Sequence, residues 1–148
     1  MTYCDSSFLT ALYITPDTFH SQAGREATKF TGAIPYTLLN ELELLNTLSR
    51  VLGNHSIDQT LHDTIIREIE TDKAEGILHP AELNQIKLYE KARELSRKHT
   101  SALACRSLDI LHVASALVLK ANSFASFDFR QRKLAAVAHL TLVPAHVR

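Results

Sequence analysis

One stretch, residues 106–119, restricts the fold more than any other part of this sequence. It predicts a helix that is apolar on nearly every face, with the sequence Arg-Ser-Leu-Asp-Ile-Leu-His-Val-Ala-Ser-Ala-Leu-Val-Leu. A helix without a wide polar face belongs in the interior of a protein. Asp109 lies near its start, where a carboxylate is costly unless it is paired or binds a metal. Either Asp109 forms a buried ion pair with Arg106, or it is a catalytic carboxylate with partners elsewhere in the chain.

Length and charge restrict the class of protein. The 148 residues suit one domain, and we expect residues 1–148 to form it. The formal net charge of zero argues against a protein that coats nucleic acid through bulk charge, although it allows a local basic patch. Cys4 and Cys105 have no zinc-binding spacing, so we expect buried, reduced thiols. The sequence shows no signal peptide or transmembrane run, which predicts a cytoplasmic protein without a membrane partner.

Predicted strands and helices alternate along the chain. We expect strands at 1–4, 33–36, 123–127 and 140–143, with an extended piece at 76–80. Besides the apolar helix, we expect helices at 8–14, 16–30, 38–52, 57–75, 82–99 and 130–138. This alternation predicts an α/β fold with a short, mostly parallel sheet and a high helix content.

Several single residues make these expectations sharper. Thr37 and Ser56 are the expected N-caps of their helices, and Pro16 is the expected first residue of the helix at 16–30. Pro35 predicts that the ladder of its strand is weak or ends there. In the helix at 82–99, the apolar spacing turns Ile86 toward the core.

Two acids directly follow predicted strands. Asp5 comes after the first strand, and Asp128 comes after the strand at 123–127. In open parallel sheets, ligands bind beyond the carboxyl ends of the strands, so both acids should lie at one edge, where Asp109 also points. Taken singly, Asp5 and Asp128 are better explained as helix N-caps. Their combination with a buried Asp109 favours a shared site.

A fourth acid comes from the segment Asn40-Glu-Leu-Glu-Leu-Leu-Asn46. On a helical wheel Glu41 lies near the centre of the leucine face and Glu43 lies almost opposite, so periodicity alone selects Glu41. Converging carboxylates repel one another unless cations hold them, and a ligand set of oxygens suits Mg²⁺ or Mn²⁺. His112, one turn after Asp109, is better explained as a core histidine or one that orients a ligand than as a metal ligand.

These pieces resemble the PIN-domain ribonucleases, in particular the VapC-type toxins. The matching motifs occur in the order of the family and span nearly the whole chain: Asp5-Ser-Ser after a strand, Leu42-Glu-Leu-Leu-Asn46, residues 106–116, Phe127-Asp-Phe-Arg-Gln131 and Lys133-Leu-Ala135. The motif around residues 106–116 and the Phe-Asp-x-Arg-Gln motif are fairly specific, whereas Asp5-Ser-Ser alone is weak. The family motif has its acid three residues before Asn46, so it selects Glu43 instead of Glu41.

The resemblance implies an α/β/α sandwich with a parallel sheet of four or five strands. It also implies an endoribonuclease that depends on Mg²⁺ or Mn²⁺ and cleaves single-stranded or looped RNA through a metal-activated water. The catalytic and metal-binding acids would be Asp5, Glu43, Asp109 and Asp128, with Asp109 or Asp128 as the proton acceptor. A small antitoxin protein would inhibit the enzyme, and homodimers would form.

Alternatives stay open at this stage. Two basic groups either bind RNA phosphates or form solvated helix faces: Arg130, Arg132 and Lys133, and Arg93, Arg97 and Lys98. A haloacid dehalogenase needs a second acid where Ser7 stands, and a receiver domain needs a mid-chain acid and a late lysine, so neither class fits. The remaining alternative is a non-catalytic PIN-like module that binds RNA or a protein partner.

Overall fold

Five short parallel strands form the centre of the computed structural model, which describes all of residues 1–148. Three of them, β1 (Thr2–Cys4), β4 (Ser123–Ala125) and β5 (Thr141–Val143), pair in the order β1-β4-β5. The other two, β2 (Ile34–Tyr36) and β3 (Leu78–Pro80), pair with each other. Since β2 lies beside β1, the strands follow one another as β3-β2-β1-β4-β5. The expected short parallel sheet is confirmed.

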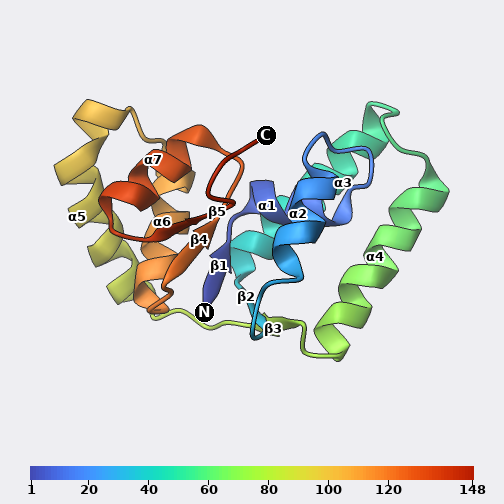
Figure 1. Cartoon of the computed structure of the whole chain (residues 1–148), viewed down its shortest axis with the longest axis horizontal. Helices are drawn as coiled ribbons and strands as arrows, with labels where there is room; N and C mark the ends of the chain where they lie inside the picture. Colours follow the sequence, from blue (N-terminus) through green and yellow to red (C-terminus); the bar gives the residue numbers. More distant parts are fainter.

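Seven helices cover the two sides of these strands (Figure 1). One layer holds α1 (Ser6–Tyr13), α2 (His20–Ala27), α3 (Leu38–Gly53) and α4 (Gln59–Ala74). The other layer holds α5 (Gln85–Leu103), α6 (Ser107–Val118) and α7 (Phe129–Val137). Each layer has its own hydrophobic core, one around Phe8, Leu44 and Leu48 and the other around Val113, Phe124 and Leu134. The expected α/β/α sandwich is therefore confirmed.

Pro35 interrupts the hydrogen bonding between the two strand groups. In β2, Ile34 N donates to Ile77 O and Tyr36 O accepts from Ala81 N, so these two residues face β3. Alternation along the strand turns Pro35 toward β1, and proline has no N–H to donate. No backbone ladder joins β1 to β2, in agreement with the weak ladder expected at Pro35.

A buried amide bridges this gap. Asn40, fully buried in the first turn of α3, donates through Nδ2 to the carbonyl of Cys4 at 3.0 Å. The same side chain accepts from Thr37 N at 3.0 Å, while Thr37 Oγ1 accepts from Asn40 N at 3.2 Å. This reciprocal capping box confirms Thr37 as the N-cap of α3. The start of α3 is thereby fixed to the end of β1.

Three local expectations are wrong. α4 begins two residues later than expected, because Asp58 and not Ser56 provides the cap. α2 begins at His20 instead of Pro16, because Asp17 Oδ1 accepts from a nearby backbone N–H at 2.8 Å and holds the segment in a turn. Ile86 is 72% exposed, since α5 begins only at Gln85 and buries Leu88, Ala92 and Leu95.

Both cysteines were expected to be buried, reduced thiols. Cys4 is buried and free, as predicted, whereas Cys105 is free but only half-buried, so its expected burial is wrong.

None of the helices combines the length and the apolar character that crossing a membrane requires.

Arg132 has a role that the sequence did not indicate. Its side chain is buried in α7, and its guanidinium donates to four backbone carbonyls, those of Ser126, Val143, Pro144 and Ala145, at 2.8–3.3 Å. Both expectations for Arg132, phosphate binding and a solvated face, are therefore wrong. The guanidinium instead fixes the end of β4 to the residues that follow β5.

Replacing this arginine should destabilise the fold. Arg132→Met leaves the buried carbonyls without a donor, and we expect the free energy of unfolding to fall by about 3 kcal/mol. Arg130→Met, an exposed position on the same helix, should change it by less than about 0.5 kcal/mol. Urea denaturation followed by circular dichroism measures both. Equal losses in the two variants would contradict the role assigned to Arg132.

Candidate functional site

A cleft of about 580 Å³ lies at the carboxyl ends of β1 and β4. Three of the four predicted acids line it: Glu43 from α3, Asp109 from α6 and Asp128 from the N-cap of α7. Asp5 is fully buried behind Ser7, to which it is hydrogen-bonded. The full lining comprises Ser6, Ser7, Thr10, Asp17, Phe19, Glu43, Thr47, Arg50, Arg106, Ser107, Leu108, Asp109, Phe127, Asp128 and Gln131.

Asp5 is held by donors from two elements. Its Oδ1 accepts from the Ser7 hydroxyl at 2.7 Å and from Phe8 N at 2.8 Å, and its Oδ2 accepts from the Ser126 hydroxyl at 2.6 Å. Asp5 thus caps α1 and also ties β1 to the end of β4. Burial raises the pKa of Asp5, although His112 and these hydrogen bonds favour its ionised form.

The two serines after Asp5 each donate a hydrogen bond to an acid of the predicted site. The Ser6 hydroxyl donates to the carboxylate of Glu43. The Ser7 hydroxyl donates to Asp5 and accepts from Phe127 N at 2.9 Å. The Asp5-Ser-Ser motif therefore connects the first turn of α1 to both Asp5 and Glu43.

Asp109 and Asp128 combine a capping role with a position in the cleft. Asp128 is half-buried, and its Oδ1 accepts from the N–H groups of Arg130 at 2.7 Å and Gln131 at 3.1 Å. Asp109 is only 7% exposed, and its Oδ2 accepts from Arg106 N at 3.0 Å. Of the two alternatives for Asp109, the ion pair with the Arg106 guanidinium is absent, because the backbone of Arg106 makes the contact. That leaves the guanidinium in the lining of the cleft.

The structure separates the two acids of α3. Glu43 lines the cleft, and its Oε2 lies 2.5 Å from His112 Nε2. Glu41 lies outside the cleft and pairs with Lys73 at 3.0 Å. Burial acts to raise the pKa of Glu43, but hydrogen bonds with His112 and Ser6 outweigh it and lower the pKa. Glu43 is therefore ionised at neutral pH.

Helical periodicity misled the choice between these acids. It treated every leucine of α3 as facing the core, yet only Leu44 and Leu48 are fully buried. Leu38 and Leu42 are 80% and 67% exposed. The face that packs inward is therefore rotated away from the one that the leucine count indicated.

Sequence reasoning missed Arg50, which lines the cleft together with Thr47. Glu43, Thr47 and Arg50 stand four and then three residues apart, so they share one face of α3. That spacing was available once Glu43 had been chosen. It missed Asp17 and Phe19 because they lie in the turn that replaces the expected start of α2.

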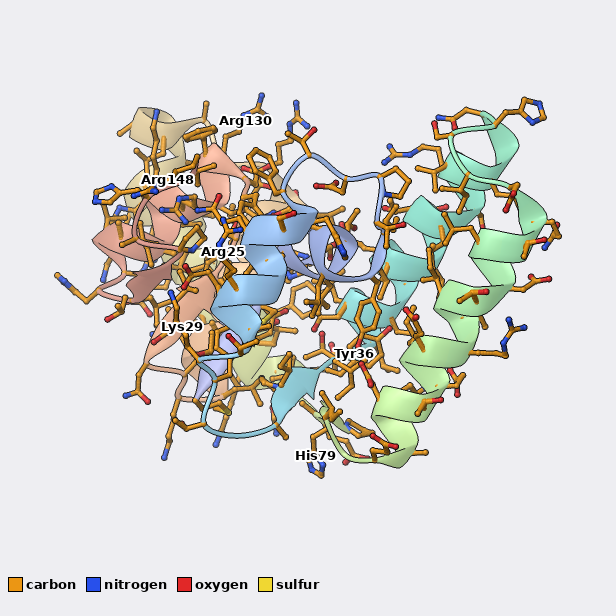
Figure 2. The ribbon with its side chains drawn as sticks, turned by 45° about the vertical axis from the view of Figure 1, so that its right-hand side comes forward. Arg25, Lys29, Tyr36, His79, Arg130 and Arg148 are labelled. Carbon is orange, nitrogen blue, oxygen red and sulfur yellow. The ribbon has the colours of Figure 1, made fainter.

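None of the residues in the two predicted basic groups lines the cleft. Arg93 and Arg97 line a separate hollow with two glutamates of α5, and Lys98 pairs with Glu94 at 2.8 Å. This group is absent from the cleft. Arg130, two residues after Asp128, is exposed, and Figure 2 shows it on the same side of the molecule as Arg25 and Arg148.

The residues of the cleft fit a hard divalent cation by their chemistry. The acids offer only oxygen atoms, the donors that Mg²⁺ and Mn²⁺ prefer. No three His, Cys, Asp or Glu side chains stand close enough together to hold an ion in the present arrangement. Both oxygens of Asp5 are bound to donors of the protein, whereas Glu43 is bound through Oε2 alone. A complete ligand set therefore requires the acids to move closer together.

Comparison with known proteins decides the family. The family model described as "PIN domain" matches residues 2–137. The chain belongs to the PIN-domain family. Among solved structures, this PIN domain is similar to the Mycobacterium tuberculosis toxin VapC20, which is described as cleaving the sarcin-ricin loop. The two share 16% sequence identity and a TM-score of 0.69, over 90% of this chain and 94% of VapC20, which shows a common fold. No curated protein sequence matches.

The buried charge of Asp5 should cost stability. Because burial raises its pKa above that of the unfolded chain, the ionised form is unfavourable in the folded state at neutral pH. Asp5→Asn removes the charge and keeps the capping geometry. We expect it to raise the free energy of unfolding by about 0.5–2 kcal/mol in metal-free buffer.

Asp128→Asn provides the matched control, because Asn is an equally good N-cap and Asp128 is only half-buried. Chemical denaturation at pH 7 compares the two variants. A loss of stability in Asp5→Asn would show that the carboxylate is stabilising where it stands.

Proposed function

We propose that this PIN domain is an endoribonuclease of the VapC type that depends on Mg²⁺ or Mn²⁺. One observation carries the proposal: Glu43, Asp109 and Asp128 face a single cleft of a PIN fold, with Asp5 buried directly behind it. The shared fold of VapC20, described as a toxin that cleaves the sarcin-ricin loop, supports a nucleic-acid loop as the class of substrate.

The proposed roles follow from the positions of the side chains. Asp5, Glu43, Asp109 and Asp128 would hold the cation, which when bound lowers the pKa of a water molecule and offsets phosphate charge. Asp109 or Asp128 would accept the proton of the attacking water, because each keeps one carboxylate oxygen outside its capping bonds.

Two arginines are suited to the RNA backbone. Arg50 and Arg106 line the same cleft as the acids, and neither forms an ion pair within the chain. We infer that they bind the phosphates on either side of the scissile bond. Local cations of this kind explain how a chain without net charge can hold a polyanion.

The proposal includes the partners expected from the family resemblance. The protein would act as the toxin of a toxin–antitoxin pair, blocked by a small antitoxin, and would form homodimers. Exposed apolar side chains support a protein partner, among them Leu38 and Leu42 on α3 and Ile86 and Tyr89 on α5. Both partners stay predictions, which co-expression with the neighbouring reading frame and light scattering would test.

The alternative is a PIN-like module that binds RNA or protein without cleaving it. The presence of an acid at all four motif positions argues against this function. A cheap discriminator is the melting temperature in Mn²⁺ and in EDTA. The nuclease should be stabilised by Mn²⁺, and this stabilisation should disappear in Asp5→Asn.

Substitution of the acids should abolish cleavage. We expect Asp5→Asn and Asp109→Asn each to lower the rate of Mn²⁺-dependent cleavage of a looped RNA at least about 100-fold, with the fold intact. Glu41→Gln is the matched control, since Glu41 pairs with Lys73 outside the cleft, and it should cleave at the wild-type rate. Gel analysis of end-labelled RNA measures all three. Unchanged cleavage in both aspartate variants would refute the proposed site.

A further inference from the structure

A line of hydrogen-bonded side chains runs from the core to the cleft. His112 is fully buried in α6; its Nδ1 lies 2.9 Å from the Tyr3 hydroxyl of β1. Its Nε2 lies 2.5 Å from Glu43 Oε2 and 3.1 Å from Ser6 Oγ. We propose that Tyr3 and His112 are positioning residues that fix the carboxylate of Glu43 at the cleft. This role rests on the proposed nuclease function.

The partners of the ring determine which nitrogen faces Glu43. The Glu43 carboxylate accepts at Oε2, 2.5 Å from Nε2, so Nε2 carries a proton. On the other side of the ring, the Tyr3 hydroxyl lies 2.9 Å from Nδ1 and can either donate or accept there. Tyr3 thereby holds the ring with Nε2 turned toward Glu43.

The geometry at Glu43 leaves one oxygen available. Both donors, His112 and Ser6, contact Oε2, while Oε1 has no hydrogen-bond partner in the protein. A free glutamate side chain loses rotamer entropy when it is fixed. In this protein that entropy is lost on folding, before a ligand binds, so Oε1 is presented to the cleft in one orientation. Partners of this kind typically change metal affinity or activity 10–100-fold when they are removed.

Three substitutions test the arrangement. We expect His112→Leu to weaken Mn²⁺ binding, measured by calorimetry, and to lower kcat for RNA cleavage, each about 10–100-fold, with KM for RNA little changed. His112→Gln should recover part of both, because its amide nitrogen can still donate to Glu43. Tyr3→Phe, a milder change that retains the ring in the core, should give an intermediate loss.

The matched control is Tyr36→Phe. The Tyr36 hydroxyl is also buried but has no hydrogen-bond partner, so its removal should leave Mn²⁺ affinity and kcat unchanged. Wild-type Mn²⁺ affinity and kcat in both His112→Leu and Tyr3→Phe would overturn the proposal. An equal loss in His112→Leu and His112→Gln would also overturn it, since the donated hydrogen bond would then be irrelevant.

A measurement without metal or RNA separates this inference from the proposed function. Long-range ¹H–¹⁵N NMR correlations of the metal-free protein should show a proton on Nε2 of His112. A proton at Nδ1 alone in the wild type would overturn the positioning role even if the chain cleaves RNA. Conversely, a wild type that cleaves no RNA would refute the proposed function while the NMR result still decides how Glu43 is held.

Discussion

The burial of the Asp5 carboxylate at the end of β1 is the constraint on which the rest of the site depends. A charge with no exposure to water needs donors, and Ser7, Ser126 and Phe8 N supply them from α1 and from the end of β4. These bonds fix the junction of β1, α1 and β4, from which the walls of the cleft begin. Arg132, also buried, adds a nearby cation. Burial lowers the pKa of its guanidinium, and the charge of Asp5 offsets only part of that change.

The apolar helix α6 is the second rigid component. Val113, Ala114 and Ala116 are fully buried, so the helix has little freedom to shift against its neighbours. Asp109 and His112, one turn apart on this helix, reach the cleft directly and through Glu43 respectively. A chemical site on a well-packed helix is held more accurately than one on a loop. The unusual apolar composition of this stretch thus serves the polar groups that it carries.

The sequence was sufficient for the architecture and for the edge where the acids gather. The carboxyl ends of parallel strands share an edge, so Asp5 and Asp128 could be placed from strand positions alone. Contacts between distant segments could not be foreseen. Nothing in the local sequence of α7 reveals that Arg132 is buried against carbonyls beyond β5, or that Lys73 draws Glu41 away from the cleft. Local pattern describes one helix face, whereas packing decides which face is buried.

Because β1 and β2 share no backbone ladder at Pro35, the sheet that carries the cleft is not continuous. Glu43 stands on α3, which follows β2, whereas Asp109 and Asp128 stand on α6 and at the start of α7 in the other layer, and no backbone ladder joins β2 to β1. The separation of these carboxylates is set by the amide of Asn40 and by side-chain contacts, which yield more easily than a ladder of strands. The bond between His112 on α6 and Glu43 on α3 crosses between the two helical layers there, so side chains rather than strand pairing determine how far apart these acids stand.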